Sequence, residues 1–180
     1  MSDKTNQLLN KLRGILLPAT TNFHSDSSLD LASFSSNLDK WLATGINGVV
    51  LLGSTGERVH LNEREYLQII QTARAQVPND RVLIVGAGQQ STVGTINEIQ
   101  VAVEAGADAV LVITPHFYRS AMTQEALFGF YTSVADASRI PVLLYSMPAL
   151  TGIKIEPETI ARLSQHPNII GVKDSSNDMV

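Results

Sequence analysis

Hydrophobic positions along the chain fall into short runs that are separated by longer amphipathic stretches. The runs are rich in Val, Ile and Leu and lack polar alternation, which is typical of strands buried on both faces of a parallel sheet. The pattern predicts six strands, at residues 14–20, 48–53, 82–87, 109–114, 141–146 and 169–175.

The stretches between these runs have the period of amphipathic helices. One stretch places Phe34, Leu38 and Trp41 on a single helical face, and the next does the same with Tyr66 and Ile70. The strands begin roughly 30 residues apart, which is the size of one βαβ unit. We therefore expect five connecting helices and right-handed crossovers between parallel strands.

Several helix boundaries follow from local side-chain chemistry. Asn62 can cap a helix, and Glu65, three residues later, can return a hydrogen bond to the backbone of the capping residue. Gly45 and Gly106 stand where two helices should end, and Pro157 suits the first turn of another.

Two architectures share this alternation of strands and helices. An open doubly wound sheet could be complete in 180 residues, whereas a (β/α)8 TIM barrel typically needs about 250. Polar residues favour the barrel, because they follow the carboxyl ends of nearly all the strands, as the loops around one barrel mouth require: Thr20, Thr21, residues 54–57, His116, Tyr145 and Lys173. We predict one α/β domain over residues 1–180, an incomplete TIM barrel with strands 1 to 6 but without strands 7 and 8 or the C-terminal helices.

Composition narrows the range of partners. With 44% hydrophobic and 17% charged residues the chain can bury a sizeable core, and a net charge of −4 supplies no basic surface for nucleic acid. The absence of cysteine excludes disulfides and thiolate metal sites. The four histidines have no metal-ligand spacing, so no metal is expected. A small metabolite is the expected ligand.

The chain start and the hydrophobic runs bear on location. The N-terminal segment lacks the apolar stretch of a signal peptide, and no apolar run approaches the ~18 residues of a membrane span. We expect no membrane segment and a cytoplasmic protein.

Lys173 and Tyr145 are the candidate catalytic residues. Desolvation at a strand end would favour the neutral amine of Lys173, which is the form that attacks a ketone to give an imine. A phenol at the end of the preceding strand, Tyr145, can relay protons. The plain alternatives are a surface lysine and a core tyrosine. Asp174 should point away from Lys173, because side chains alternate along a strand.

Two glycine-bearing loops can bind anions. In Gly53-Ser54-Thr55-Gly56-Glu57, glycines bracket two hydroxyl residues, so that Ser54 and Thr55 and the backbone N–H groups can meet a carboxylate. An ordinary βα turn has a similar composition. The second loop, around Gly86 and Gly88, resembles a dinucleotide-binding turn only weakly, because Ser91 replaces the third glycine. No organic cofactor is expected.

Four motifs together resemble the dihydrodipicolinate synthase and N-acetylneuraminate lyase family: GSTGE, TPHFY, LYSMPALTG and IIGVKDSS, at residues 53–57, 114–118, 144–152 and 169–176. The resemblance implies a Schiff-base aldolase on a TIM barrel. It implies that Lys173 forms the imine with pyruvate and that Tyr145 relays protons. It also implies that Ser54 and Thr55 bind the pyruvate carboxylate and that the full-length protein is a homotetramer.

Two departures from the family pattern narrow the substrate. Synthases that use aspartate semialdehyde carry an arginine where this chain has Leu150, and a tyrosine where it has Phe117. Tyr118 lies one position away, which changes its direction. The resemblance then favours 4-hydroxy-2-oxoglutarate aldolase, which forms pyruvate and glyoxylate without a metal or an organic cofactor. Enzymes similar to N-acetylneuraminate lyase or dihydrodipicolinate synthase are the alternatives.

The length of the chain opens a further alternative. Strands one and six would be exposed apolar edges without the rest of the barrel. The sequence is therefore interpreted either as a C-terminally incomplete part of an active lyase, or as a short, inactive chain with a structural or partner-dependent role.

Overall fold

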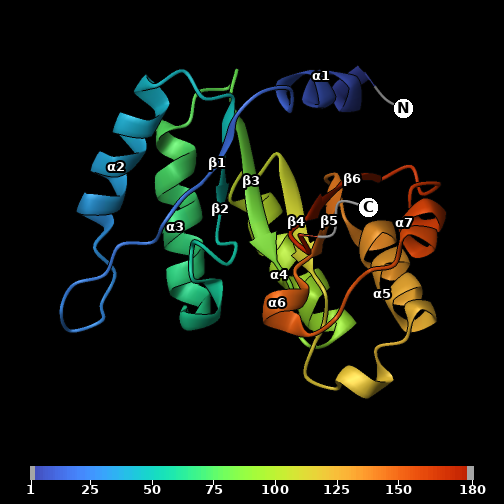
Figure 1. The fold of residues 1–180 in the computed structure, drawn as a ribbon. Coiled ribbons are helices and arrows are strands. Elements are labelled where there is room, and N and C mark those ends of the chain that lie inside the picture. Colours follow the sequence, from blue (N-terminus) through green and yellow to red (C-terminus); the bar gives the residue numbers. More distant parts are fainter. Residues whose placement is uncertain (1–2, 178–180) are drawn as a thin grey trace. The chain divides into compact units, whose positions relative to one another are not determined.

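The computed structural model describes residues 3–177. All six predicted strands are present (Figure 1), as β1 (Leu16–Pro18), β2 (Gly48–Leu51), β3 (Val82–Ala87), β4 (Ala109–Ile113), β5 (Val142–Ser146) and β6 (Ile169–Asp174). The five predicted connecting helices are α2 (Leu31–Ala43), α3 (Glu63–Gln76), α4 (Thr92–Glu104), α5 (Gln124–Ala137) and α7 (Pro157–Leu163).

Four further elements were not predicted. They are helix α1 (Asp3–Lys11), helix α6 (Pro148–Thr151) and the 3₁₀ turns η1 (Arg58–His60) and η2 (Arg119–Ala121). The last three span fewer residues than the two turns that a helical period needs to show. The predicted capping box at Asn62 and Glu65 is confirmed, with hydrogen bonds of 3.0 and 2.9 Å.

The strand order decides between the two predicted architectures. The strands follow one another as β1-β2-β3-β4-β5-β6, in the order of the chain. A doubly wound sheet reverses its strand order at a switch point, whereas a barrel adds each strand beside the previous one. The order is therefore that of a barrel.

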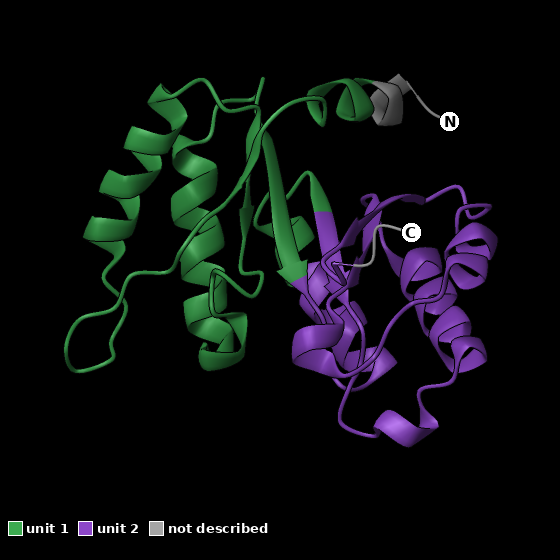
Figure 2. Ribbon diagram, in the orientation of Figure 1, with its two compact units in different colours: residues 1–86, 101–109 green, residues 87–100, 110–180 purple. Residues whose placement is uncertain are grey.

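The chain forms two compact units (Figure 2). The first holds β1, β2 and most of β3, in parallel register with Leu16 beside Gly48 and Gly48 beside Val82. Helices α2 and α3 bring Phe34 and Tyr66 into its core, each at most 1% exposed. The Tyr66 hydroxyl donates a hydrogen bond of 3.1 Å to the carbonyl of Gly86. This bond ties α3 to the carboxyl end of β3.

The second unit holds most of β4 together with β5 and β6, again in parallel register. The Tyr131 hydroxyl, on α5, donates a hydrogen bond of 3.0 Å to the carbonyl of Val112 on β4. Burial raises the pKa of the Tyr131 hydroxyl above its usual range, and a backbone hydrogen bond from Tyr145 opposes the shift. Each unit thus fastens a helix to a strand through one buried tyrosine.

The outermost strands have one partner each. Within residues 3–177, β1 pairs only with β2 and β6 only with β5, as predicted for the two edges. Only Ile169 is fully buried in β6, and Val172 is 40% exposed. The helices in the same part of the chain are all too short or too polar to cross a bilayer.

Candidate active site

Lys173 and Tyr145 lie side by side at the ends of two adjacent strands. The register of β5 and β6 pairs the two residues directly, so both side chains leave the sheet on the same face. The Lys173 Nζ atom is 4.5 Å from the centroid of the Tyr145 ring. Tyr145 is 3% exposed, while Lys173 is half-buried. The structure therefore brings the two predicted catalytic residues together within the second unit.

The Asp174 carboxylate makes hydrogen bonds to the turn after β6. It accepts hydrogen bonds from the Ser176 backbone N–H, at 2.9 Å, and from the Ser176 hydroxyl, at 3.1 Å. These bonds hold the turn that follows β6. No salt bridge to Lys173 occurs within residues 3–177. Its ammonium lies over the face of the Tyr145 ring, which attracts cations.

Ser54 and Thr55 belong to the first unit, in the loop after β2. Both are exposed. The loop closes on itself, because the Gly56 N–H donates to the Gly53 carbonyl at 3.0 Å and the Glu57 N–H donates to the Ser54 carbonyl at 3.2 Å. The result is a tight turn that presents the two hydroxyl residues to solvent.

The residue before this turn has an unusual backbone. Leu52 has a φ angle of 57°, in the left-handed region, although its side chain is only 2% exposed. For a residue with a Cβ this conformation costs about 1–2 kcal/mol. Strained backbone of this kind collects at functional sites, where the surrounding structure maintains it.

The loop after β3 does not suit a dinucleotide phosphate. Its Gly88 N–H already donates to the Glu98 carboxylate at 2.7 Å, and the Gln89 N–H donates to the Thr95 hydroxyl at 3.0 Å. Glu98 is only 7% exposed, so a phosphate at this loop would meet a buried acidic side chain. The weak glycine pattern of the sequence here has a structural cause, because Gly88 has a φ of 147° and packs closely against Ile113.

Gln90 holds the loop after β4. Its side-chain oxygen accepts hydrogen bonds of 2.9 Å from the backbone N–H groups of both His116 and Phe117. The exposed rings of Phe117 and Tyr118 form an edge-to-face pair with centroids 5.0 Å apart. Neither Gln90 nor Glu98 was singled out from the sequence. Both are polar residues near glycines. That pattern is typical of loops in general and does not predict which contacts the residues make.

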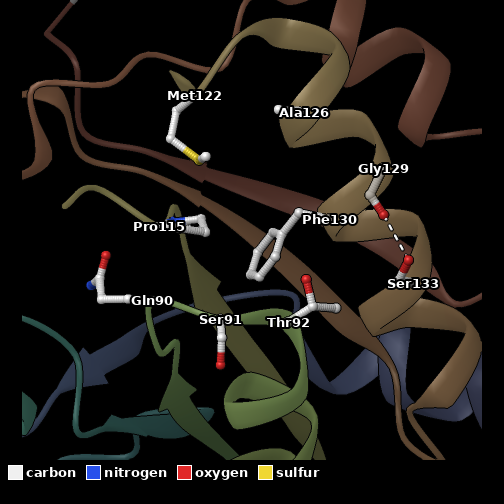
Figure 3. Close-up of a pocket in the computed structure, with 9 residues that line it drawn as sticks. All are labelled: Gln90, Ser91, Thr92, Pro115, Met122, Ala126, Gly129, Phe130 and Ser133. Atoms are coloured by element: carbon white, nitrogen blue, oxygen red, sulfur yellow. Dashed lines mark hydrogen bonds between the residues drawn. The ribbon is translucent and has the colours of Figure 1, made fainter. Parts of the chain in front are cut away.

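A pocket of about 520 Å³ lies in the second unit (Figure 3). Its lining comes from the loop after β3, the start of α4, the loop after β4 and one face of α5: Gln90, Ser91, Thr92, Pro115, Met122, Ala126, Gly129, Phe130 and Ser133. The lining includes neither Lys173 nor Tyr145, so this pocket is separate from the candidate catalytic pair.

Comparison with known proteins identifies the family. The model of the dihydrodipicolinate synthetase family matches residues 11–180. The chain belongs to this family. A 4-hydroxy-tetrahydrodipicolinate synthase from Stenotrophomonas maltophilia is 37% identical over 167 residues, which cover 93% of this chain and 56% of the relative. The chain thus spans little more than half the length of the relative, and the predicted resemblance to the family is confirmed.

Solved structures of family members confirm the fold class. The dihydrodipicolinate synthase of Acinetobacter baumannii, complexed with pyruvate, matches with a TM-score of 0.87 and 32% identity over 92% of this chain and 56% of that one. YagE, a prophage protein of the family from E. coli K12 in complex with pyruvate, matches with a TM-score of 0.84 and 34% identity, over 91% and 54% of the two chains. The described residues form an incomplete (β/α)8 barrel.

Proposed function

We propose that this chain carries the Schiff-base nucleophile of a class I aldolase that acts on pyruvate-containing oxo acids, and that the nucleophile is Lys173. The proposal rests on the pairing of Lys173 with Tyr145 at neighbouring strand ends, in a chain of a family whose solved members include complexes with pyruvate. A lysine and a phenol in contact provide the two functions that imine chemistry needs, a nucleophilic amine and a proton relay.

The reaction begins when the neutral Lys173 amine attacks the ketone carbon of a 4-hydroxy-2-oxo acid. Loss of water from the carbinolamine gives an imine, whose protonated nitrogen accepts electrons when the bond between C3 and C4 breaks. The C4 hydroxyl loses its proton and becomes the carbonyl group of the departing aldehyde, and the remaining enamine is protonated at C3. Hydrolysis then releases pyruvate and the free lysine. Tyr145 is the group that moves protons between these steps.

Ser54 and Thr55 are proposed to take the carboxylate of the oxo acid. Both residues are exposed in a turn whose backbone hydrogen bonds fix its shape. Hydroxyl and N–H donors fixed in advance bind an anion without a further ordering cost. Family membership supports the role, because the resemblance implies that GSTGE, at residues 53–57, binds the carboxylate.

The proposed substrate is 4-hydroxy-2-oxoglutarate, which would give pyruvate and glyoxylate. Leu150 and Phe117 are 60% and 73% exposed. The resemblance implies an arginine and a tyrosine at these positions in the synthases, and leucine lacks the charge with which that arginine grips the carboxylate of aspartate semialdehyde. Condensation of pyruvate with aspartate semialdehyde is the second candidate, and it is favoured by the relatives named 4-hydroxy-tetrahydrodipicolinate synthase. A reaction of the N-acetylneuraminate lyase type is the third.

A function of another class competes with these. The exposure of β6 supports a chain that is inactive by itself and has a structural or partner-dependent role.

We also propose that the full-length protein is a homotetramer and that it is located in the cytoplasm. Neither a metal nor an organic cofactor is required, since the lysine supplies the covalent chemistry.

The decisive experiment is borohydride trapping with pyruvate, followed by peptide mass spectrometry. It is applied to the 180-residue chain and to a completed chain, in which this sequence is joined to the C-terminal barrel segment of a homologous synthase. We expect a reduced pyruvate adduct on Lys173 of the completed chain. The adduct should vanish in Lys173→Arg and persist in Lys40→Arg, which replaces an exposed lysine on α2.

Other outcomes separate the competing functions. A folded completed chain that traps nothing at Lys173 rejects the aldolase proposal. Trapping in the completed chain but not in the short one supports the inactive-chain alternative for the 180 residues. To distinguish the substrates, cleavage of 4-hydroxy-2-oxoglutarate is compared with condensation of pyruvate and aspartate semialdehyde. We expect the first to dominate, and Leu150→Arg to shift the ratio toward the second by at least about tenfold.

A further inference from the structure

The turn that carries Ser54 and Thr55 begins after Leu52, the residue that follows β2. Leu52 has a left-handed backbone, with a φ angle of 57°, and the chain changes direction there. Leucine has no intrinsic preference for this conformation, in contrast to glycine and asparagine. Something outside the residue must therefore maintain it.

Gly86, on β3, packs directly against the carboxyl side of Leu52. A Cβ atom at Gly86 would collide with the Leu52 carbonyl oxygen, and would lie 2.6 Å from its carbonyl carbon and 2.9 Å from the nitrogen of Gly53. All three atoms are backbone, which cannot rotate aside. Gly86 itself has no positive φ angle, so glycine is required here for close approach rather than for its own conformation.

Gly56 packs against the amino side of the same residue. A Cβ atom there would lie 2.6 Å from the Leu52 nitrogen, 2.9 Å from the Leu52 Cα atom and 3.1 Å from the carbonyl oxygen of Ala19. Again the neighbours are backbone atoms, and again the glycine has no positive φ angle. The two glycines hold the left-handed residue from opposite ends.

Two buried hydroxyl groups anchor the glycines in turn. The Tyr66 hydroxyl donates to the carbonyl of Gly86 at 3.1 Å, and the Thr21 hydroxyl donates to the carbonyl of Gly56 at 2.6 Å. Tyr66 is 1% exposed and Thr21 is 7% exposed. Helix α3 and the segment after β1 thus hold the two glycines in place. The glycines in turn restrain the backbone of Leu52, which sets the direction in which the turn leaves β2.

We infer that Gly86 and Gly56 are positioning residues for the carboxylate of the oxo-acid substrate. They act through Leu52, whose left-handed backbone orients the N–H groups and hydroxyls of Ser54 and Thr55. The inference rests on the proposed function, because it takes Ser54 and Thr55 as the carboxylate site. Gly86 then has a role in binding the substrate carboxylate rather than a dinucleotide. Thr21 contributes to the same role, because its hydroxyl holds Gly56.

The test measures how the rate of borohydride trapping at Lys173 depends on pyruvate concentration in the completed chain. Misplacement of the turn should weaken carboxylate binding while leaving the imine chemistry at Lys173 intact. We expect Gly86→Ala to raise the half-saturating pyruvate concentration about tenfold with less than about a twofold change in the limiting rate. Thr21→Val, which removes only a hydroxyl, should raise it about threefold with the same limiting rate.

A double variant and a control separate positioning from general damage. Adding Leu52→Gly to Gly86→Ala gives the clashing backbone room to move, so part of the lost affinity should return. Gly129→Ala, on α5, introduces a Cβ atom where nothing lies within 4 Å and should leave the pyruvate dependence unchanged. Circular dichroism and thermal melts confirm that each variant is folded.

The outcomes are distinct. A wild-type chain that traps pyruvate, with folded Gly86→Ala and Thr21→Val variants that saturate at the wild-type concentration, overturns the inference and leaves the proposed function in place. If Gly86→Ala does not fold, a wild-type pyruvate dependence of Thr21→Val alone overturns it. A wild-type completed chain that traps no pyruvate rejects the proposed function and the positioning role together.

Discussion

Strands β3 and β6 are of equal length, yet their environments differ. Each has six residues; β3 is VLIVGA, and β6 is IIGVKD, which ends on two charged residues. All six residues of β3 are buried, whereas β6 is fully buried only at Ile169. The difference comes from neighbours, since within residues 3–177 β6 is hydrogen-bonded to a strand on one side only.

This contrast matters because the candidate nucleophile is on the less protected strand. An amine attacks a ketone only when neutral, and burial is what disfavours its charged form. Lys173 is half-buried, and its Nζ atom lies 4.5 Å from the centroid of the Tyr145 ring. The lysine and its phenol partner are thus in contact on a strand that, within residues 3–177, is paired on one side only.

The largest effect on the rate of pyruvate trapping is expected when the C-terminal barrel segment is added beside β6. In the completed chain, we expect pyruvate trapping at Lys173 to be at least about a hundredfold faster than in the 180-residue chain, because strands packed beside β6 would exclude water from the amine and so disfavour its charged form. The measurement is the trapping rate at saturating pyruvate, with trapping at Lys40 as the internal reference. Equal rates in the two chains would show that the six strands already suffice.

Matched core substitutions in the two strands should differ in cost. Val85→Ala, at a β3 position that is 0% exposed, removes two buried carbon atoms and should lower the free energy of unfolding by about 2 kcal/mol. Val172→Ala, at a β6 position that is 40% exposed, should lower it by less than about 1 kcal/mol. Urea denaturation of both variants checks this, and equal losses would mean that β6 is as well covered in solution as β3.

Tyr131 offers a smaller test, of burial beside the candidate site. Tyr131→Phe leaves the Val112 carbonyl without its donor and should cost about 1 kcal/mol of stability. The pKa of the folded phenol is raised, so its contribution is complete below the unfolded value of about 10 and is lost as the pH rises above it. The free energy of unfolding is measured between about pH 8 and pH 11, on either side of that value. It should fall less steeply with pH in Tyr131→Phe than in the wild-type chain.

The smallest effect is expected at an ion pair between two exposed residues. Arg162 donates to the Glu125 carboxylate at 2.8 and 3.3 Å, and this hydrogen bond lowers the pKa of Glu125. A lowered pKa stabilises the fold above the unfolded value of the carboxyl group, and the contribution is lost as the pH falls through the folded value. Arg162→Gln should return the Glu125 pKa, followed by NMR titration, toward its usual value. An unchanged titration would show that the pair does not persist in solution.

The six strands and the connecting helices could be predicted because their signals are periodic and local. Buried parallel strands produce continuous apolar runs, and the cap at Asn62 is a contact between residues three positions apart. The short elements α6 and η1 could not, since a single turn leaves no period to recognise. For the candidate site, the positions of Lys173 and Tyr145 at strand ends could be predicted, but the choice of Leu52 as the left-handed residue could not.

The sequence by itself determined that this protein alternates strands and helices, and its motifs were sufficient to indicate the family. Both are properties of residues close together in the chain or of short ordered patterns. Only the tertiary structure decided that the strands keep barrel order, that Glu98 fills the glycine loop after β3, and that Gly86 approaches Leu52 from 34 positions away. The reason is physical: close packing between distant segments depends on backbone geometry, which the identity of a glycine permits but does not specify.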